Sequence, residues 1–356
     1  MASPNGGIIG VDNPPTEQPE VITTFNASGT LTTAPYTTEL QYVVVAGGGG
    51  GGGQMGGGGG AGGYRSSVPG ESSGGGASAE ATTPVSGASP YPIIVGAGGA
   101  ASPGTGGGPG NASLLPGGAG NASTLGTPSP ISTVGGAGGG ANGGPGTGTG
   151  GSGGGTGRYG PEGGNPTIDR LGTPGQGFPG GIMFPRDWPV MPPNGDDNTA
   201  SGGGGAGAVG GNNQAAFGSN PPVGISGDGG VGVESSITGS PVFRGGGGGG
   251  GGRRNGTQSI VTMGAGGNGG GGHGGVWPTT PGPLGLPAPI ARSTEGTANT
   301  GGGGGGGASQ PTTSPGRAGG SGVVIVKEPE GPFKCTGVWD MNALYDNVKA
   351  GTWTNA

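Results

Sequence analysis

The chain is poor in the residues from which most catalytic and metal sites are made. Its 356 residues include one cysteine, Cys335, and one histidine, His273, and only 8% of them are charged. A single cysteine excludes an intrachain disulfide framework, and one cysteine with one histidine cannot complete a zinc site. His273 stands among glycines with no nucleophile or acid close to it in the sequence. We therefore expect no enzyme activity, no bound metal and no cofactor.

Long apolar runs and basic clusters are also missing. The net charge is −6, and Arg253-Arg254 is the only basic cluster. Nucleic-acid binding needs a concentrated positive surface that attracts phosphate, so nucleic acid is not an expected partner. A membrane-spanning helix needs about 18 or more consecutive apolar residues, and the sequence has no such run of side-chain-bearing residues. We accordingly expect no membrane insertion.

Glycine and proline dominate what is present. The 108 glycines and 35 prolines make up about two fifths of the chain, a proportion typical of disordered or low-complexity segments. Collagen is excluded, because glycine occurs in blocks such as residues 47–53 and 245–252 and not at every third position. Composition alone would favour a flexible linker or insert.

Two β-branched runs enclose the glycine-rich region. Residues 40–45 (LQYVVV) lead into the first glycine block, and residues 323–326 (VVIV) follow the last one. Few other apolar runs exist, so pairing the two is the simplest way to bury both. We predict that they are neighbouring strands of one sheet, which would close the insert between them.

Two further segments have strand character. Residues 21–31 (VITTFNASGTL) carry β-branched and aromatic residues around an Asn-Ala-Ser-Gly turn, which predicts a hairpin. Residues 91–95 (YPIIV) predict a weaker strand. Because Pro92 lacks an N–H, that strand is expected to begin there or to lie at a sheet edge.

Glycine blocks can be ordered as polyglycine-II helices, which have three residues per turn and no internal hydrogen bonds. Without Cβ atoms, neighbouring helices approach closely enough to bond backbone to backbone. Ordering glycine costs about 0.5 to 1 kcal/mol more than ordering alanine, and each hydrogen bond returns about 1 kcal/mol. A single helix would not hold, whereas a bundle would. The expected fold is thus mostly irregular and all-β, with short strands framing a polyglycine-II bundle or sandwich.

The predicted organisation has three parts: an N-terminal arm (1–20), a glycine-rich domain (21–327) and a C-terminal attachment module (328–356). The module contains the one predicted α-helix, which Asp340 caps and Gly351 ends. At about ten residues this helix is too short to be stable alone. We expect it to dock on the same chain or on another subunit through Trp339, Leu344, Tyr345, Val348 and Trp353.

Aromatic residues return in a few places between the glycine blocks. Residues 178–193 are stiffened by proline and contain Phe178, Phe184 and Trp188, with Arg186 and Asp187 beside the tryptophan. Such a loop suits stacking on a sugar ring or anchoring in a protein pocket. The alternative is a plug that covers the end or flank of the glycine bundle. Two further candidate contact residues are Trp277 and Tyr159.

Several of these segments together resemble the glycine-rich tail proteins of bacteriophages. The resemblance rests on residues 25–30 (FNASGT), 42–46 (YVVVA) with its glycine block, 59–65 (GGAGGYR), 91–99 (YPIIVGAGG) and 320–326 (GSGVVIV), and it covers about residues 21–327. Residues 337–353 are similar to a short terminal module of marine phage structural proteins.

The resemblance implies a virion location in a tail fibre or receptor-binding adhesin, with a layered polyglycine-II domain that displays loops at one end. It also implies other virion proteins as partners, a host surface glycan or outer-membrane protein as a further partner, and a homo-oligomer, with a trimer as one arrangement. The competing hypothesis is an architectural virion component, such as a head fibre, decoration protein or tail connector subunit.

Overall fold

The computed structural model describes residues 16–103, 115–142, 148–158, 170–183, 199–216, 223–253, 260–277, 292–308, 315–334 and 348–349. These residues form short β-strands and irregular segments, and helix is limited to the 3₁₀ turn η1 (Gly74–Gly76) and the pair Val348–Lys349. The expectation of a mostly irregular, all-β chain is confirmed. Apart from those last two residues, the predicted C-terminal helix lies outside the described residues.

The two β-branched runs are neighbours in one sheet, as predicted. β4 (Glu39–Val45) pairs antiparallel with β17 (Val323–Glu328), and the register places Val45 opposite Val323 and Tyr42 opposite Val326. β2 (Val21–Phe25) lies on the other side of β17, while β5 (Tyr64–Ser66) and β6 (Thr83–Pro84) pair with β4.

The hairpin predicted over residues 21–31 is wrong. β2 and β3 (Gly29–Thr32) are both strands, but β2 pairs with β17 whereas β3 joins a second sheet in the order β3-β7-β8-β9. The other members of that sheet are β7 (Pro90–Ile94), β8 (Ser123–Leu125) and β9 (Ile131–Thr133). Longer apolar strands offered each half of the segment a better partner than the other half did.

β7 is not an edge strand, contrary to the sequence prediction. It has β3 on one side and β8 on the other. Pro92 is opposite Thr30 of β3, whereas pairing with β8 begins only at Ile93. On the β8 side the Pro92 carbonyl accepts from the Gly126 N–H at 2.9 Å, so the residue without an N–H lies at the margin of that pairing.

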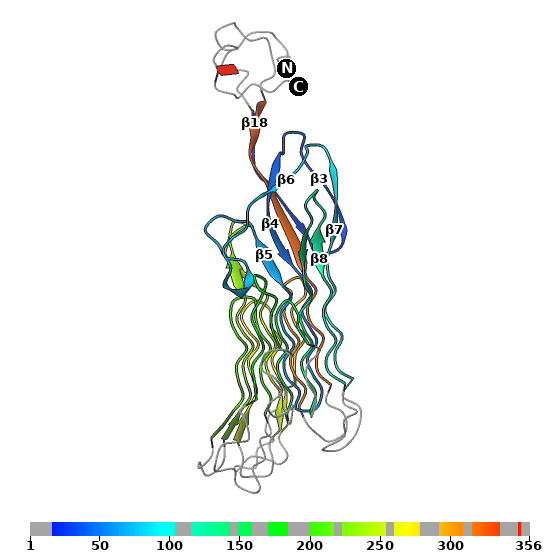
Figure 1. Cartoon of the computed structure of the whole chain (residues 1–356), viewed down its shortest axis with the longest axis vertical. Coiled ribbons are helices and arrows are strands. Elements are labelled where there is room, and N and C mark those ends of the chain that lie inside the picture. Colours follow the sequence, from blue (N-terminus) through cyan, green and yellow to red (C-terminus); the bar gives the residue numbers. More distant parts are fainter. Residues whose placement is uncertain are drawn as a thin grey trace, which may run out of the picture.

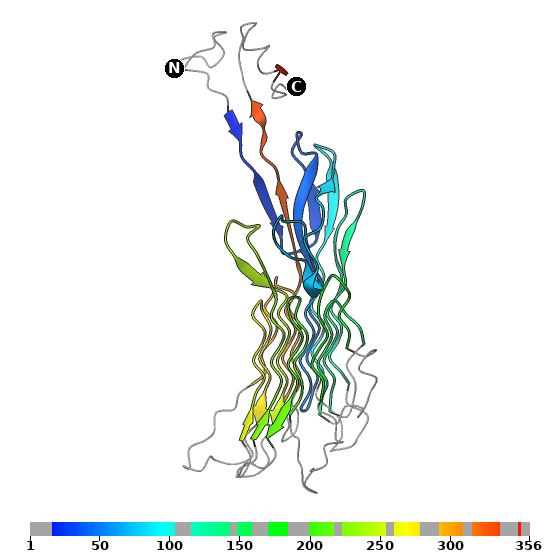
Figure 2. The same ribbon diagram turned by 60° about the vertical axis from the view of Figure 1, so that its left-hand side comes forward.

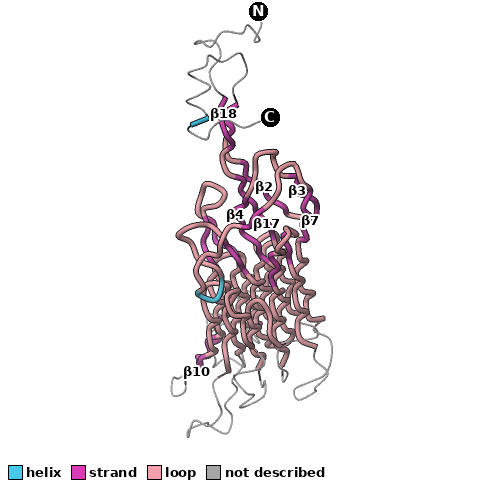
Figure 3. The backbone as a smooth tube through the Cα atoms, turned by 45° about the horizontal axis from the view of Figure 1, so that its top comes forward, coloured by secondary structure: helices cyan, strands magenta, loops and turns pink. Residues whose placement is uncertain are grey.

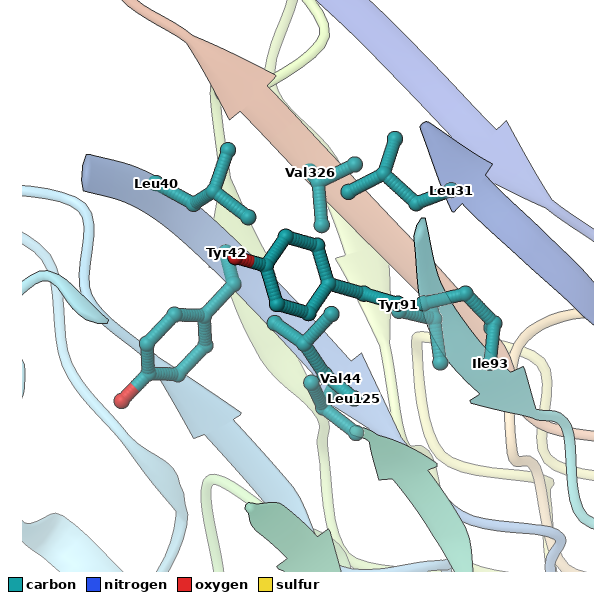
Figure 4. Packing of buried hydrophobic residues seen from close by; sticks show 9 residues of the cluster. Leu31, Leu40, Tyr42, Val44, Tyr91, Ile93, Leu125 and Val326 are labelled. Atoms are coloured by element: carbon teal, nitrogen blue, oxygen red, sulfur yellow. The ribbon is translucent and has the colours of Figure 1, made fainter. Parts of the chain in front are cut away.

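The two sheets enclose the main hydrophobic core. Side chains from β3, β7 and β8 point toward those of β4 and β17, and Tyr91 inserts among them (Figure 4). Full burial of a large apolar side chain contributes about 1.5 to 3 kcal/mol, so this cluster stabilises the packing of the two sheets. Its buried members are Leu31, Leu40, Tyr42, Val44, Tyr91, Ile93, Leu125, Val324 and Val326.

Two carboxylates bind the loops above the core. Glu328 is 4% exposed and accepts hydrogen bonds from the Ala34 N–H at 2.8 Å and from Thr37 Oγ1 at 2.5 Å. Glu80 accepts from Arg65 Nε at 2.7 Å and from the Tyr42 hydroxyl at 2.9 Å. Burial of Tyr42, with the Glu80 carboxylate next to it, raises the pKa of Tyr42 above its ordinary value.

Below the core the glycine-rich segments run side by side as extended tracts along the long axis (Figures 1 and 2). Successive N–H groups of one tract donate to three different neighbours. Gly47 donates to Asn121, Gly48 to Gly320 and Gly49 to Gly60, at 2.8 to 3.0 Å, and the same three neighbours follow again from residue 50. Hydrogen bonding therefore repeats every three residues.

These bonds order the tracts into rows, which we call the glycine array. The first row holds 117–121, 134–141, 150–158 and 177–182; the second 96–102, 46–52, 56–63, 200–206 and 207–212; the third 315–322, 301–307, 245–252 and 226–232; the fourth 292–298, 270–276 and 263–268.

Five tracts are enclosed by hydrogen-bonded tracts on all six sides, namely 46–52, 56–63, 200–206, 245–252 and 301–307. They include the longest uninterrupted glycine blocks of the sequence. An enclosed tract has no free side on which a side chain could lie, which is why glycine fills nearly every position there.

Short strands mark both ends of the array. The hairpin of β12 (Val233–Ser235) and β13 (Val242–Arg244) lies at the core end. β10 (Gln214–Ala216), β11 (Val223–Ile225) and β15 (Ile260–Thr262) form a small sheet at the far end, where β14 (Gly252–Arg253) also pairs with β16 (Val276–Trp277). β10 is labelled at that end in Figure 3.

The described residues nearest the two chain termini lie together beyond the core. β1 (Thr16–Gln18) and β18 (Gly331–Lys334) form a two-stranded antiparallel ribbon that extends away from the body (Figures 1 and 2). The ribbon continues from β2 and β17, and Lys327 Nζ forms an ion pair with Glu20 at 2.5 Å at their junction.

Candidate functional site

Many of the tracts end at the far end of the array, near β10, β11, β14, β15 and β16. The chain leaves and re-enters the described ranges at this end, opposite the terminal ribbon (Figure 2). The residue pairs that bracket these segments are Pro103 and Leu115, Met183 and Thr199, Ala216 and Val223, Arg253 and Ile260, Trp277 and Arg292, and Ala308 and Pro315.

One connection at this end is described throughout. Residues 53–55 turn the chain from one enclosed tract into the next, with positive φ at Gln54 (48°) and Met55 (56°). Met55 is 2% exposed, its carbonyl accepts from the Arg158 N–H at 3.0 Å, and Arg158 Nη1 approaches Met55 Sδ at 3.7 Å. Arg158 is itself buried. The turn and this arginine cover the centre of the array.

Small polar side chains replace glycine in the tracts near the same end. The Thr156 and Ser201 hydroxyls are 2.9 Å apart, and Asn213 Nδ2 donates to Thr199 Oγ1 at 3.2 Å. All four residues are buried. Buried hydroxyls and amides need partners, and these side chains supply them to one another. The far end of the array thus contains buried polar side chains that are hydrogen-bonded to one another.

The structure separates the predicted contact residues. Phe178 lies in the 177–182 tract at the core end, where its N–H donates to the Gly205 carbonyl at 3.0 Å and its side chain is half-buried. It is therefore part of the array and not of a loop. The backbone of Trp277 lies in β16 at the far end, paired with Arg253 of β14. Tyr159, Phe184, Arg186, Asp187 and Trp188 lie outside the described residues.

The C-terminal docking residues are almost entirely untested by the structure. Val348 is helical and 57% exposed. Trp339, Leu344, Tyr345 and Trp353 lie outside the described residues. Their docking role stays a prediction.

Side-chain acceptors along the flanks of the array were missed by sequence reasoning. His273 Nδ1 accepts from the Gly266 N–H at 3.1 Å, and the Thr294 hydroxyl accepts from the His273 N–H at 2.8 Å. The sequence does contain a signal for such residues, because non-glycine residues recur at every third position in several of the outer tracts. That signal becomes readable only when the period of the hydrogen bonds is known.

Candidate metal ligands are not clustered among the described residues. Among them, no three residues of the types His, Cys, Asp and Glu lie close enough together to hold a metal ion. Likewise, no helix within the described ranges is both long enough and apolar enough to cross a bilayer.

Comparison with protein families identifies the chain. The model of the glycine-rich domain family matches residues 24–328, which is most of the chain and nearly the whole of the predicted glycine-rich domain, and the chain belongs to this family. Comparison with curated proteins gives no match.

Proposed function

We propose that the glycine array is a polyglycine-II bundle that serves as a rigid platform. The support is the three-residue repeat of its backbone hydrogen bonds, which is the repeat of a helix with three residues per turn. Enclosed tracts bond to six neighbours for one ordering cost, which offsets the entropy of ordering glycine. Amide hydrogen exchange tests the proposal: the Gly49, Gly59 and Gly304 amides should be protected to the level of the valine amides of β4.

We propose that this platform belongs to a bacteriophage virion protein, a tail fibre or receptor-binding adhesin. The carrying observation is that the terminal ribbon lies at the opposite end of a long body from the small strands β10, β11, β14, β15 and β16, where many of the tracts end (Figures 1 and 2). Such a body can be held by other virion proteins at the ribbon end and present the opposite end to a host surface. The resemblance to phage tail proteins supplies the biological setting of the proposal.

Contact with the host rests on the aromatic residues between the tracts. Trp188, with Arg186 and Asp187 beside it, and Trp277 are the proposed anchors for a surface glycan or an outer-membrane protein. Each contact is weak by itself, and copies on one virion would multiply its strength. A homo-oligomer, for which a trimer is one arrangement, would provide such copies.

Binding to cells tests the adhesin. The purified chain, fluorescently labelled, is screened against a panel of bacterial strains, and a bound strain should lose at least tenfold in signal with Trp188→Ala or Trp277→Ala. Val209→Ala is the matched control, because Val209 is an exposed apolar residue on the flank of the array, and it should bind as the wild type does. If no strain binds a folded wild-type chain, or if neither tryptophan variant loses signal, the adhesin is refuted and the architectural role is favoured.

A further inference from the structure

Outer tracts differ from enclosed tracts in a regular way. In the 226–232 tract Asp228 and Val231 are exposed, while Gly227 and Gly230 are buried against the array. In the 96–102 tract Ala97 and Ala100 are exposed, while Gly99 is buried. Because three residues make one repeat, positions three apart lie on the same side of a tract, about 9 Å apart. The outward side of these two tracts therefore carries side chains and the inward side carries glycine.

The same pattern holds in several further outer tracts. Residues three positions apart are exposed in each of several outer tracts: Ala119 and Ala122; Val209 and Asn212; Ala265 and Asn268; Glu295 and Ala298. The first-row tracts 134–141 and 150–158 lack the pattern, because residues 135–141 and 150–158 are all buried.

A Cβ atom is incompatible with the spacing between tracts. A Cβ built on Gly49 would lie 2.0 Å from the Ala137 carbonyl oxygen, and one built on Gly203 would lie 2.1 Å from the Gly59 carbonyl oxygen. Ordinary contacts of this kind begin near 3.4 Å. Two tracts can therefore bond backbone to backbone only where neither places a side chain between them.

The flanks use two kinds of side chain. On some, a polar side chain accepts an outer N–H group: Asp228 Oδ1 accepts from Ala265 at 2.7 Å, and Asn212 Oδ1 accepts from Ile182 at 2.8 Å. The flank formed by the 96–102 and 117–121 tracts has methyl groups instead. There the N–H groups of Ala97, Ala100 and Ala119 donate to no other described residue.

We infer that the outward side chains at every third position confine the glycine array to a single chain. An array edge is a ready template for a second copy, whose outer tract has the same three-residue repeat and the same backbone groups. The side chains hold two copies too far apart for backbone hydrogen bonds. The alanine flank depends on methyl groups alone, so it is the flank where removing side chains would let copies of this chain join. This inference uses only the described array and does not depend on host attachment.

Sedimentation equilibrium of the full chain tests the inference. The flank-glycine variant carries Ala97→Gly, Ala100→Gly, Ala119→Gly and Ala122→Gly, and its mass at micromolar concentration should be twice that of the wild type or more. The same four positions changed to serine keep their Cβ atoms and should leave the mass unchanged. A second control, Ala97→Gly with Ala119→Gly, keeps one methyl group in each tract and should also leave it unchanged.

The result that overturns the inference is a flank-glycine variant with the wild-type mass and a wild-type circular dichroism spectrum. A serine variant that associates as strongly as the glycine variant would also overturn it. If the fourfold glycine variant does not fold, Ala97→Gly with Ala100→Gly exposes one tract only. It should then show a concentration-dependent rise in mass, and a constant mass would again refute the inference.

Discussion

Replacing a single glycine in an enclosed tract should destabilise the whole chain. Gly59 lies in the 56–63 tract, where its N–H donates to Gly304 at 2.9 Å and its carbonyl accepts from Gly248 at 2.9 Å. In Gly59→Ala the new Cβ would lie 2.1 Å from the Gly49 carbonyl oxygen and 2.8 Å from that of Gly50. Because these atoms belong to the backbone of another enclosed tract, no flexible side chain can relieve the overlap.

The cost follows from the bonds that must break. Restoring an ordinary contact moves one tract by about 1 Å, which takes both hydrogen bonds of Gly59 beyond bonding distance. Each loss leaves buried groups unpaired at about 1 to 3 kcal/mol, so the two together cost about 2 to 6 kcal/mol. Alanine restricts the unfolded chain and returns about 0.4 to 1 kcal/mol. A net loss of about 1 to 5.6 kcal/mol corresponds to a fall in Tm of about 2 to 22 °C.

Thermal unfolding followed by circular dichroism measures this effect. Gly29→Ala is the matched control, because Gly29 lies in β3 and its added Cβ would meet only Phe25, at 3.7 Å. The control should change Tm by no more than about 2 °C, since alanine there is free of overlap and slightly restricts the unfolded chain. The reasoning is refuted if Gly59→Ala and Gly29→Ala have the same Tm.

Three further changes test the core end. Glu328→Ala removes the acceptor of the Ala34 N–H and the Thr37 hydroxyl and should lower the free energy of unfolding by about 2 to 4 kcal/mol in urea titration; a loss below about 1 kcal/mol would contradict this. Glu80→Ala should cost about 1 to 3 kcal/mol in the same assay, and an unchanged midpoint would show that its bonds contribute nothing. Burial raises the pKa of Tyr64, so the unfolded chain loses this proton first and stability should fall above about pH 10 by up to about 1.4 kcal/mol per pH unit. Tyr64→Phe should reduce that slope, and an equal slope in both proteins would exclude Tyr64 as its source.

The framing of the domain could be predicted from local sequence. Residues 40–45 and 323–326 are the strongest apolar runs in the chain, and hydrophobic burial alone favours their pairing. The glycine blocks likewise show their capacity for close backbone packing, because only residues without a Cβ atom permit it. Both conclusions depend on what a short segment can or cannot do, whatever its neighbours are.

Strand pairing within the core could not be predicted from local sequence. Residues 21–31 favour a hairpin when considered alone, yet β2 pairs with β17 and β3 with β7. The aromatic segment from Phe178 predicts one loop when considered alone, but the backbone hydrogen bond of Phe178 to Gly205 places that residue in the array. In both cases the competing partners are far away in sequence. The free energy of pairing with them depends on those partners and cannot be deduced from the segment alone.

The sequence by itself determined the residue chemistry: a chain with few groups for catalysis, two strong strands and many tracts able to bond through their backbones. Only the tertiary structure decided which tracts are enclosed and which residues face outward. Backbone hydrogen bonds between glycine tracts do not involve side chains. Many different arrangements of the tracts would therefore form the same local hydrogen bonds. In the order that forms, the longest glycine blocks lie in the enclosed tracts, and several outer tracts place exposed side chains at every third position.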